Sequence, residues 1–88
     1  MEGSEIVRIV DIENGMRHVS IEGKIANMDR YMLVVDDESG RAFVRYSSRN
    51  LVNQIEKGNY VKIRDCQAVT YSGILQLKMQ PKGRISLR

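Results

Sequence analysis

The chain has 88 residues, of which 42% are hydrophobic and 6% aromatic, and its formal net charge is +3. This length predicts a single domain over residues 1–88, and the apolar content excludes an intrinsically disordered chain. No apolar run approaches the ~20 residues of a membrane span, and the acidic start lacks the pattern of a secretory signal, so we expect neither. The single cysteine, Cys66, can form no internal disulfide, which indicates a cytoplasmic protein with a thiol in its core.

The charge is unevenly distributed along the chain. Residues 1–44 carry a net −4 and residues 45–88 a net +7. A basic half of this kind favours an anionic partner, although the same charges could simply form a solvated face. Within the acidic half, the stretch "HVSIEGKIA" alternates apolar and polar residues.

This stretch predicts the first strand, with one face apolar and the other polar. The inward face would hold Val19, Ile21, Gly23 and Ile25, and the outward face Ser20, Glu22 and Lys24. A glycine on the inward face, Gly23, favours a bulge or a sharp bend at that point.

The next two strands are predicted in "YMLVVD" and "RAFVRY", joined by the turn "DESG". We expect Gly40 to supply the positive φ of this hairpin loop. The acids Asp36, Asp37 and Glu38 are interpreted as turn residues. Metal binding is the alternative, but no second ligand cluster or calcium-loop spacing supports it.

After the third strand, "SSRNLVNQIEKG" predicts one short helix of about two turns. Ser47 or Ser48 would cap it, and Gly58 would end it. Two more strands follow in "NYVKIRDCQAV" and "ILQLKM", joined by the turn "TYSG", and Pro81 is expected to end the last one. The core would then cover about residues 6–80, followed by a short basic tail over residues 81–88.

Three strands, a helix and two strands are the order of the oligonucleotide/oligosaccharide-binding (OB) fold. We therefore predict an all-β, five-stranded OB-fold barrel with one short helix between strands 3 and 4. An SH3-like barrel, which lacks this helix, is the second choice.

Several segments resemble the single-stranded DNA-binding domains of archaeal replication protein A and the crenarchaeal single-strand-binding proteins. The likeness lies in "IVDIENGMRHVSIEGKI", "DDESGRAFVRY" and "IEKGNYVKIRDCQAVTYSGILQLKM", over roughly residues 6–79. It implies binding of single-stranded nucleic acid, DNA favoured over RNA, without catalysis. The chain departs from the family in its short loop at residues 27–30. Two of the family's three stacking aromatics fall at Ser47 and Gln67, and only Tyr71 is kept.

Single strands bind to cations that follow the phosphates and to flat side chains on which bases stack. Phe43 and Arg45 would face solvent if Ala42 and Val44 face the core; a register shifted by one would bury Phe43 instead. The nucleic-acid-binding residues that we predict are Lys24, Arg30, Phe43, Arg45, Arg64, Tyr71, Ile74, Gln76 and Lys78. Tyr31 and Tyr60 are interpreted as packing at the ends of the barrel.

An enzyme is not expected. The lone histidine, His18, has no partner in any motif, and the sequence contains no phosphate-binding glycine loop and no metal-ligand spacing, so we expect no cofactor and no metal. Two alternatives remain for the function: single-stranded RNA binding, and a protein-interaction subunit of a replication or repair complex. The methionines Met28, Met32 and Met79 could line an apolar docking patch in the latter case.

Overall fold

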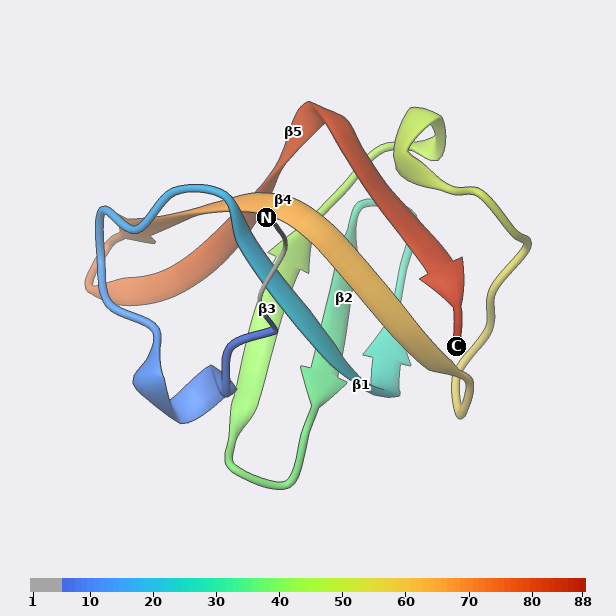
Figure 1. The fold of residues 1–88 in the computed structure, drawn as a ribbon, viewed down its shortest axis with the longest axis horizontal. Coiled ribbons are helices and arrows are strands. Elements are labelled where there is room, and N and C mark those ends of the chain that lie inside the picture. The colour runs from blue at the N-terminus through green and yellow to red at the C-terminus, as the bar shows by residue number, and fades with distance from the viewer. Residues whose placement is uncertain (1–5) are drawn as a thin grey trace.

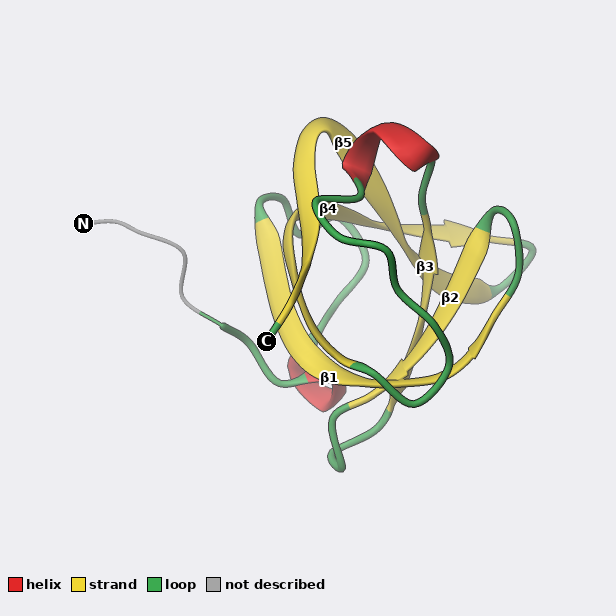
Figure 2. Cartoon of the chain, turned by 90° about the vertical axis from the view of Figure 1, so that its right-hand side faces the viewer, coloured by secondary structure: helices red, strands yellow, loops and turns green. Residues whose placement is uncertain are grey.

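The computed structural model describes residues 6–88, in which five strands form a closed barrel with the order β1-β2-β3-β5-β4 (Figure 1). All neighbouring strands are antiparallel except β3 and β5, which are parallel. The strands are β1 (Val19–Met28), β2 (Met32–Asp36), β3 (Arg41–Arg45), β4 (Tyr60–Tyr71) and β5 (Ile74–Leu87). Figure 2 shows two short 3-10 turns at opposite ends of the barrel, η1 (Ile9–Asp11) and η2 (Ser48–Asn50). The predicted all-β, five-stranded barrel is confirmed.

The core forms because apolar residues alternate along the strands and point inward. Side chains from all five strands are fully buried, and removing this apolar surface from water is the main stabilising contribution. They include Ile21, Ile25, Leu33, Val35, Val44, Val61, Ile63, Ala68, Leu77 and Ile85. The predicted inward face of β1 is confirmed, with one exception on the outward face: Ser20 is buried, and its carbonyl accepts a hydrogen bond from the Val7 N–H at 2.9 Å.

Gly23 lies where β1 passes close beneath β2. A Cβ atom there would lie 2.7 Å from the carbonyl oxygen of Asp36, closer than real Cβ atoms approach. The predicted bulge is not at this residue. The register of β1 shifts on either side of it, between Val19 and Ile21 and between Ile25 and Asn27. Glycine is therefore required here for the close approach of two strands.

The predicted two-turn helix is much shorter in the structure. Only η2 forms, and Leu51 directly after it makes an isolated bridge with Ile85 of β5. The Asn50 amide donates to the carbonyl oxygens of Gln80 and Gly83, at 3.1 and 2.9 Å. These contacts with β5 override the local helical preference and hold residues 51–58 as an irregular connection. No helix within residues 6–88 has the length and apolar character needed to cross a membrane.

The last strand continues past Pro81, against the prediction. The register between β4 and β5 shifts at this level, because Cys66 pairs with Met79 whereas Arg64 pairs with Arg84. Pro81 lies within that shift, where its missing N–H removes no ladder hydrogen bond. The expected basic tail is therefore mostly strand: β5 extends to Leu87, and residues 84–87 pair with the first half of β4.

Cys66 is a core residue, as predicted. Its side chain is fully buried, and Sγ lies 3.3 Å from the Sδ atom of Met79. Burial, with a smaller contribution from the nearby Asp65 carboxylate, raises the pKa of the thiol to about 12. A thiol in this environment is protonated and unreactive at neutral pH.

Candidate nucleic-acid interface

The register of β3 places its odd-numbered side chains on the outside of the barrel. Ala42 and Val44 are buried, whereas Phe43 is 42% exposed and Arg45 is exposed. On the parallel neighbour β5, Gln76 pairs with Phe43 and Lys78 with Arg45. The predicted outward row of strand 3 is confirmed, and two residues of strand 5 extend it sideways.

The β4–β5 hairpin adds two further predicted residues to this face. Its two-residue turn, Ser72 and Gly73, has φ values of 50° and 79°, which suit a tight hairpin between right-twisted strands. Tyr71 precedes this turn and Ile74 follows it, and both are about half exposed. The guanidinium carbon of Arg45 lies 5.8 Å from the centre of the Tyr71 ring, within the range of a cation–π contact. The hairpin thus brings Tyr71 beside β3.

Six of the nine predicted site residues therefore share one outer face, which we call the platform. It consists of Phe43, Arg45, Tyr71, Ile74, Gln76 and Lys78. Two half-buried valines border it: Val34 pairs with Phe43 from β2, and Val69 pairs with Gln76 from β4. Neither valine was predicted as a site residue, although the alternation of their strands already placed both on the outward side.

Within the platform, Gln76 has an unsatisfied polar atom. Its Oε1 is buried and has no hydrogen-bond partner among the described residues. Leaving a buried acceptor unpaired costs about 1–3 kcal/mol. A hydrogen-bond donor that drew this amide outward would remove that cost.

Three predicted residues lie off the platform. Lys24 on β1 is opposite Asp36 on one side and Tyr60 on the other, and it lines an open cleft of about 720 Å³. Arg30 lies in the short connection from β1 to β2, near the Arg45 end of β3. Arg64 pairs with Arg84, on the part of β5 that follows Pro81. The structure thus does not bring Arg64 to the platform.

The prediction that Tyr31 and Tyr60 pack at the ends of the barrel is wrong. Tyr31 is 64% exposed and Tyr60 is 48% exposed. Tyr46 packs against the core instead, and its hydroxyl donates to the carbonyl oxygen of Asp29 at 2.7 Å. Burial, together with the Asp29 charge, raises the pKa of Tyr46 above its usual value. The exposed ring of Tyr60 therefore lies beside Lys24, where a ligand can reach it.

The predicted methionine patch does not form as a unit. Met79 is buried inside the barrel, and Met28 packs against the core. Met32 is half-buried and pairs with Arg45 from β2. An apolar docking surface on this barrel would have to use the platform residues rather than the methionines.

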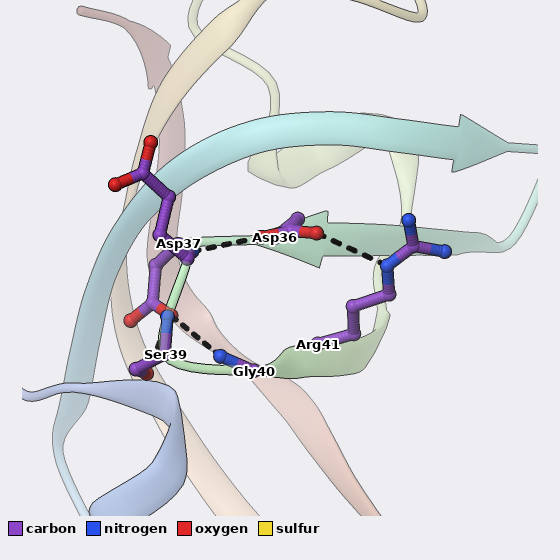
Figure 3. Close-up of polar contacts among 6 residues, drawn as sticks. Asp36, Asp37, Ser39, Gly40 and Arg41 are labelled. Atoms are coloured by element: carbon purple, nitrogen blue, oxygen red, sulfur yellow. Dashed lines mark hydrogen bonds and ion pairs between the residues drawn. The ribbon is translucent and has the colours of Figure 1, made fainter.

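The acids between β2 and β3 form a hydrogen-bonded turn (Figure 3). Asp37 accepts four hydrogen bonds: one from the Ile9 N–H on Oδ2 at 2.8 Å, and three on Oδ1 from the Ser39 N–H, the Ser39 hydroxyl and the Gly40 N–H. Asp36 accepts from the Glu38 N–H at 2.7 Å and from the Arg41 Nε at 3.1 Å. The interpretation of these acids as turn residues is confirmed, but Glu38, with φ 75°, supplies the positive φ that was expected at Gly40.

Both aspartates are held in the charged form. The Glu38 N–H, followed by the Arg41 guanidinium, lowers the pKa of Asp36. Partial burial would raise the pKa of Asp37, but the hydrogen bonds from Ser39, Ile9 and Gly40 outweigh it, so that this pKa is also lowered. The carboxylates are therefore turned toward their own loop and not toward the platform.

The barrel is similar to solved archaeal structures, while no protein-family model and no curated protein matches the chain. A replication factor A related protein from Methanobacterium thermoautotrophicum superposes with a TM-score of 0.77 at 14% identity, covering 96% of this chain and 91% of that one. An OB domain from Methanosarcina mazei gives 0.76 at 21% identity, covering 100% and 86%. One from Thermoplasma acidophilum gives 0.75 at 19% identity, covering 97% and 88%.

These likenesses define the chain as an OB-fold domain. They also confirm, at the level of the fold, the resemblance to replication protein A that the sequence indicated. Since a shared fold does not determine a ligand, the function has to be argued from the platform.

Proposed function

We propose that this domain binds single-stranded nucleic acid, DNA in preference to RNA, on the platform and without catalysing a reaction. The observation that carries the proposal is the grouping of two exposed aromatic rings, Phe43 and Tyr71, with two cations, Arg45 and Lys78. Bases stack on rings of this kind, and cations beside them neutralise the phosphates.

The charges of the platform are available to a ligand. Within residues 6–88, neither Arg45 nor Lys78 forms an ion pair. Asp36 and Asp37, in the turn that precedes β3, are occupied by the hydrogen bonds of that turn. Two stacking rings at ~1–3 kcal/mol each contribute about 2–6 kcal/mol of the roughly 8 kcal/mol that a micromolar Kd requires, and the phosphate contacts would have to contribute the remainder.

The test is fluorescence anisotropy with labelled dT, rU and duplex oligonucleotides of about 15 nucleotides, each at two salt concentrations. We expect dT to bind more tightly than rU and far more tightly than duplex. Phosphate contacts from the two platform cations, Arg45 and Lys78, would give a slope of log K against log[salt] of roughly −1.4. Absence of dT binding at low salt would refute the proposal, and tighter binding of rU would replace DNA with RNA.

A protein partner on the same platform is the second candidate. It is favoured by the apolar share of the surface, since Phe43 and Ile74 are exposed and Val34 and Val69 border them. A subunit of a replication or repair complex could dock in this way. Binding through apolar contacts would change little with salt, which separates it from nucleic-acid binding.

A further inference from the structure

A second group of cations lies on the outer face of the barrel, away from the platform. We call it the basic ribbon: Lys62 and Arg64 on the first half of β4, and Arg84 and Arg88 on the last part of β5 and directly after it. Lys62 pairs with Ser86, and Arg64 lies directly opposite Arg84. The proposed platform does not use these residues.

Acidic side chains neutralise only part of this ribbon. Glu22 on β1 contacts both Lys62, at 3.8 Å, and Arg88, at 3.6 Å. The Asp65 carboxylate is directed to His18, at 2.9 Å, and the Arg84 guanidinium contacts only backbone oxygens, of Pro81 and Gly83. Within residues 6–88, the Arg64–Arg84 pair therefore has no acidic partner.

Two like charges directly opposite each other on neighbouring strands destabilise a sheet. Both side chains are exposed and contribute nothing to the core, so burial does not account for the two opposed guanidinium groups. An anion bound across the ribbon would convert this repulsion into attraction.

The ribbon is connected to the platform through the cleft of about 720 Å³. Tyr60 begins the outward row of β4 that continues with Lys62 and Arg64, and its exposed ring forms part of the cleft wall beside Lys24. Lys57 and Arg41 also line the cleft, and Arg41 lies two residues from Phe43 on β3. Of the acids in the cleft wall, Asp36 is paired with Arg41, which leaves Glu38.

We infer that a single strand longer than the platform continues across this cleft onto the basic ribbon, with a base on Tyr60 and phosphates at Arg64 and Arg84. This inference rests on the proposed function. It assigns the ribbon to the same ligand because an aromatic ring and cations occur together along the path, which is the combination that single strands require. The domain would then contact a longer stretch of nucleic acid than its platform alone can hold.

The test compares a short oligonucleotide, dT of six nucleotides, with one of 20 nucleotides. The double variant Arg64→Gln, Arg84→Gln removes two positive charges. The single variant Arg49→Glu, at an exposed position in η2, changes the net charge by the same amount and is the matched control. At a slope of about 0.7 per phosphate contact, two lost contacts weaken binding roughly 25-fold at 0.1 M salt.

We expect the double variant to lose about 25-fold in affinity for the 20-nucleotide strand and less than twofold for the six-nucleotide strand. Arg49→Glu should change both affinities by less than twofold.

Equal losses at both lengths, or no loss at either, would overturn the inference while leaving the platform proposal intact. Failure of the unmodified protein to bind either strand would instead refute the proposed function. Binding of poly-glutamate is a further measurement. The inference would be wrong if the double variant abolished poly-glutamate binding but did not weaken binding of the 20-nucleotide strand more than that of the six-nucleotide strand. The ribbon would then be a site for an acidic protein segment.

Discussion

The turn between β2 and β3 and the platform both use strand β3, yet their polar groups serve opposite purposes. In the turn, Asp37 accepts four hydrogen bonds and Asp36 accepts two, so the carboxylates stabilise the loop that carries them. On the platform, the rings of Phe43 and Tyr71 are about half exposed, and the Gln76 oxygen has no partner. The difference separates side chains that maintain the fold from side chains that remain available to a ligand.

Removal of both platform rings has the largest expected effect. The double variant Phe43→Ala, Tyr71→Ala should weaken dT binding at least about 30-fold, because each stacked base contributes ~1–3 kcal/mol. The free energy of unfolding should change by less than about 1 kcal/mol, since both side chains lie at the surface. Anisotropy titration and urea unfolding measure the two quantities.

Val52→Ala is a suitable control for this double variant, because Val52 is an exposed apolar residue in the connection after η2. It should leave both quantities unchanged. Unaltered dT affinity in the double variant would show that the platform is not the binding surface.

The opposite result is expected for the turn. Asp37→Asn replaces one acceptor oxygen with an amide group that faces N–H donors, so the free energy of unfolding should fall by about 1–3 kcal/mol. Binding of dT should stay within twofold. Glu38→Gln removes the same charge from an exposed neighbour and should change stability little.

The effect of Asp37 also depends on pH, and its sign follows from the lowered pKa. The folded protein binds this proton less readily than the unfolded chain does, so the contribution is complete above the ordinary aspartate pKa of 3.8 and is lost as the pH falls below it. Urea unfolding at pH 7, 5 and 3 should show a smaller decline for Asp37→Asn than for the unmodified protein. An identical decline in both would contradict the role of this carboxylate.

The smallest expected effect concerns one platform cation. Arg45→Gln should lower dT affinity about fivefold at 0.1 M salt and make the salt slope shallower by about 0.7, because one phosphate contact is lost. Titrations at four salt concentrations measure the slope. Arg49→Gln is the control, and an equal change in slope for both variants would mean that Arg45 acts only through the net charge of the protein.

Strand alternation was sufficient to predict most of the barrel and much of the platform. The pattern of "RAFVRY" placed Val44 inside and Phe43 outside without any knowledge of the neighbouring strands. The errors arise where contacts distant in sequence decide the structure. The helix expected after Ser47 is replaced by the hydrogen bonds of Asn50 to β5, and Pro81 is tolerated because the register of β4 and β5 shifts at that point.

Arg64 illustrates why the site was harder to predict than the fold. It lies on the same strand as Tyr71, but the shift after it, at Asp65 with φ 66°, divides β4 between two faces of the barrel. Periodicity within a strand specifies inside or outside; it does not specify which part of the outside a residue reaches. That information resides in the pairing of strands.

The parallel contact between β3 and β5 has a consequence for the coupling of binding to folding. Only three registered pairs, from Phe43–Gln76 to Arg45–Lys78, join these two strands and close the barrel. The platform lies directly over this seam, so a strand bound there would span both sides of it. Such a ligand would oppose local opening of the barrel between β3 and β5. By linkage, its measured affinity would depend on the free energy that keeps these two strands paired.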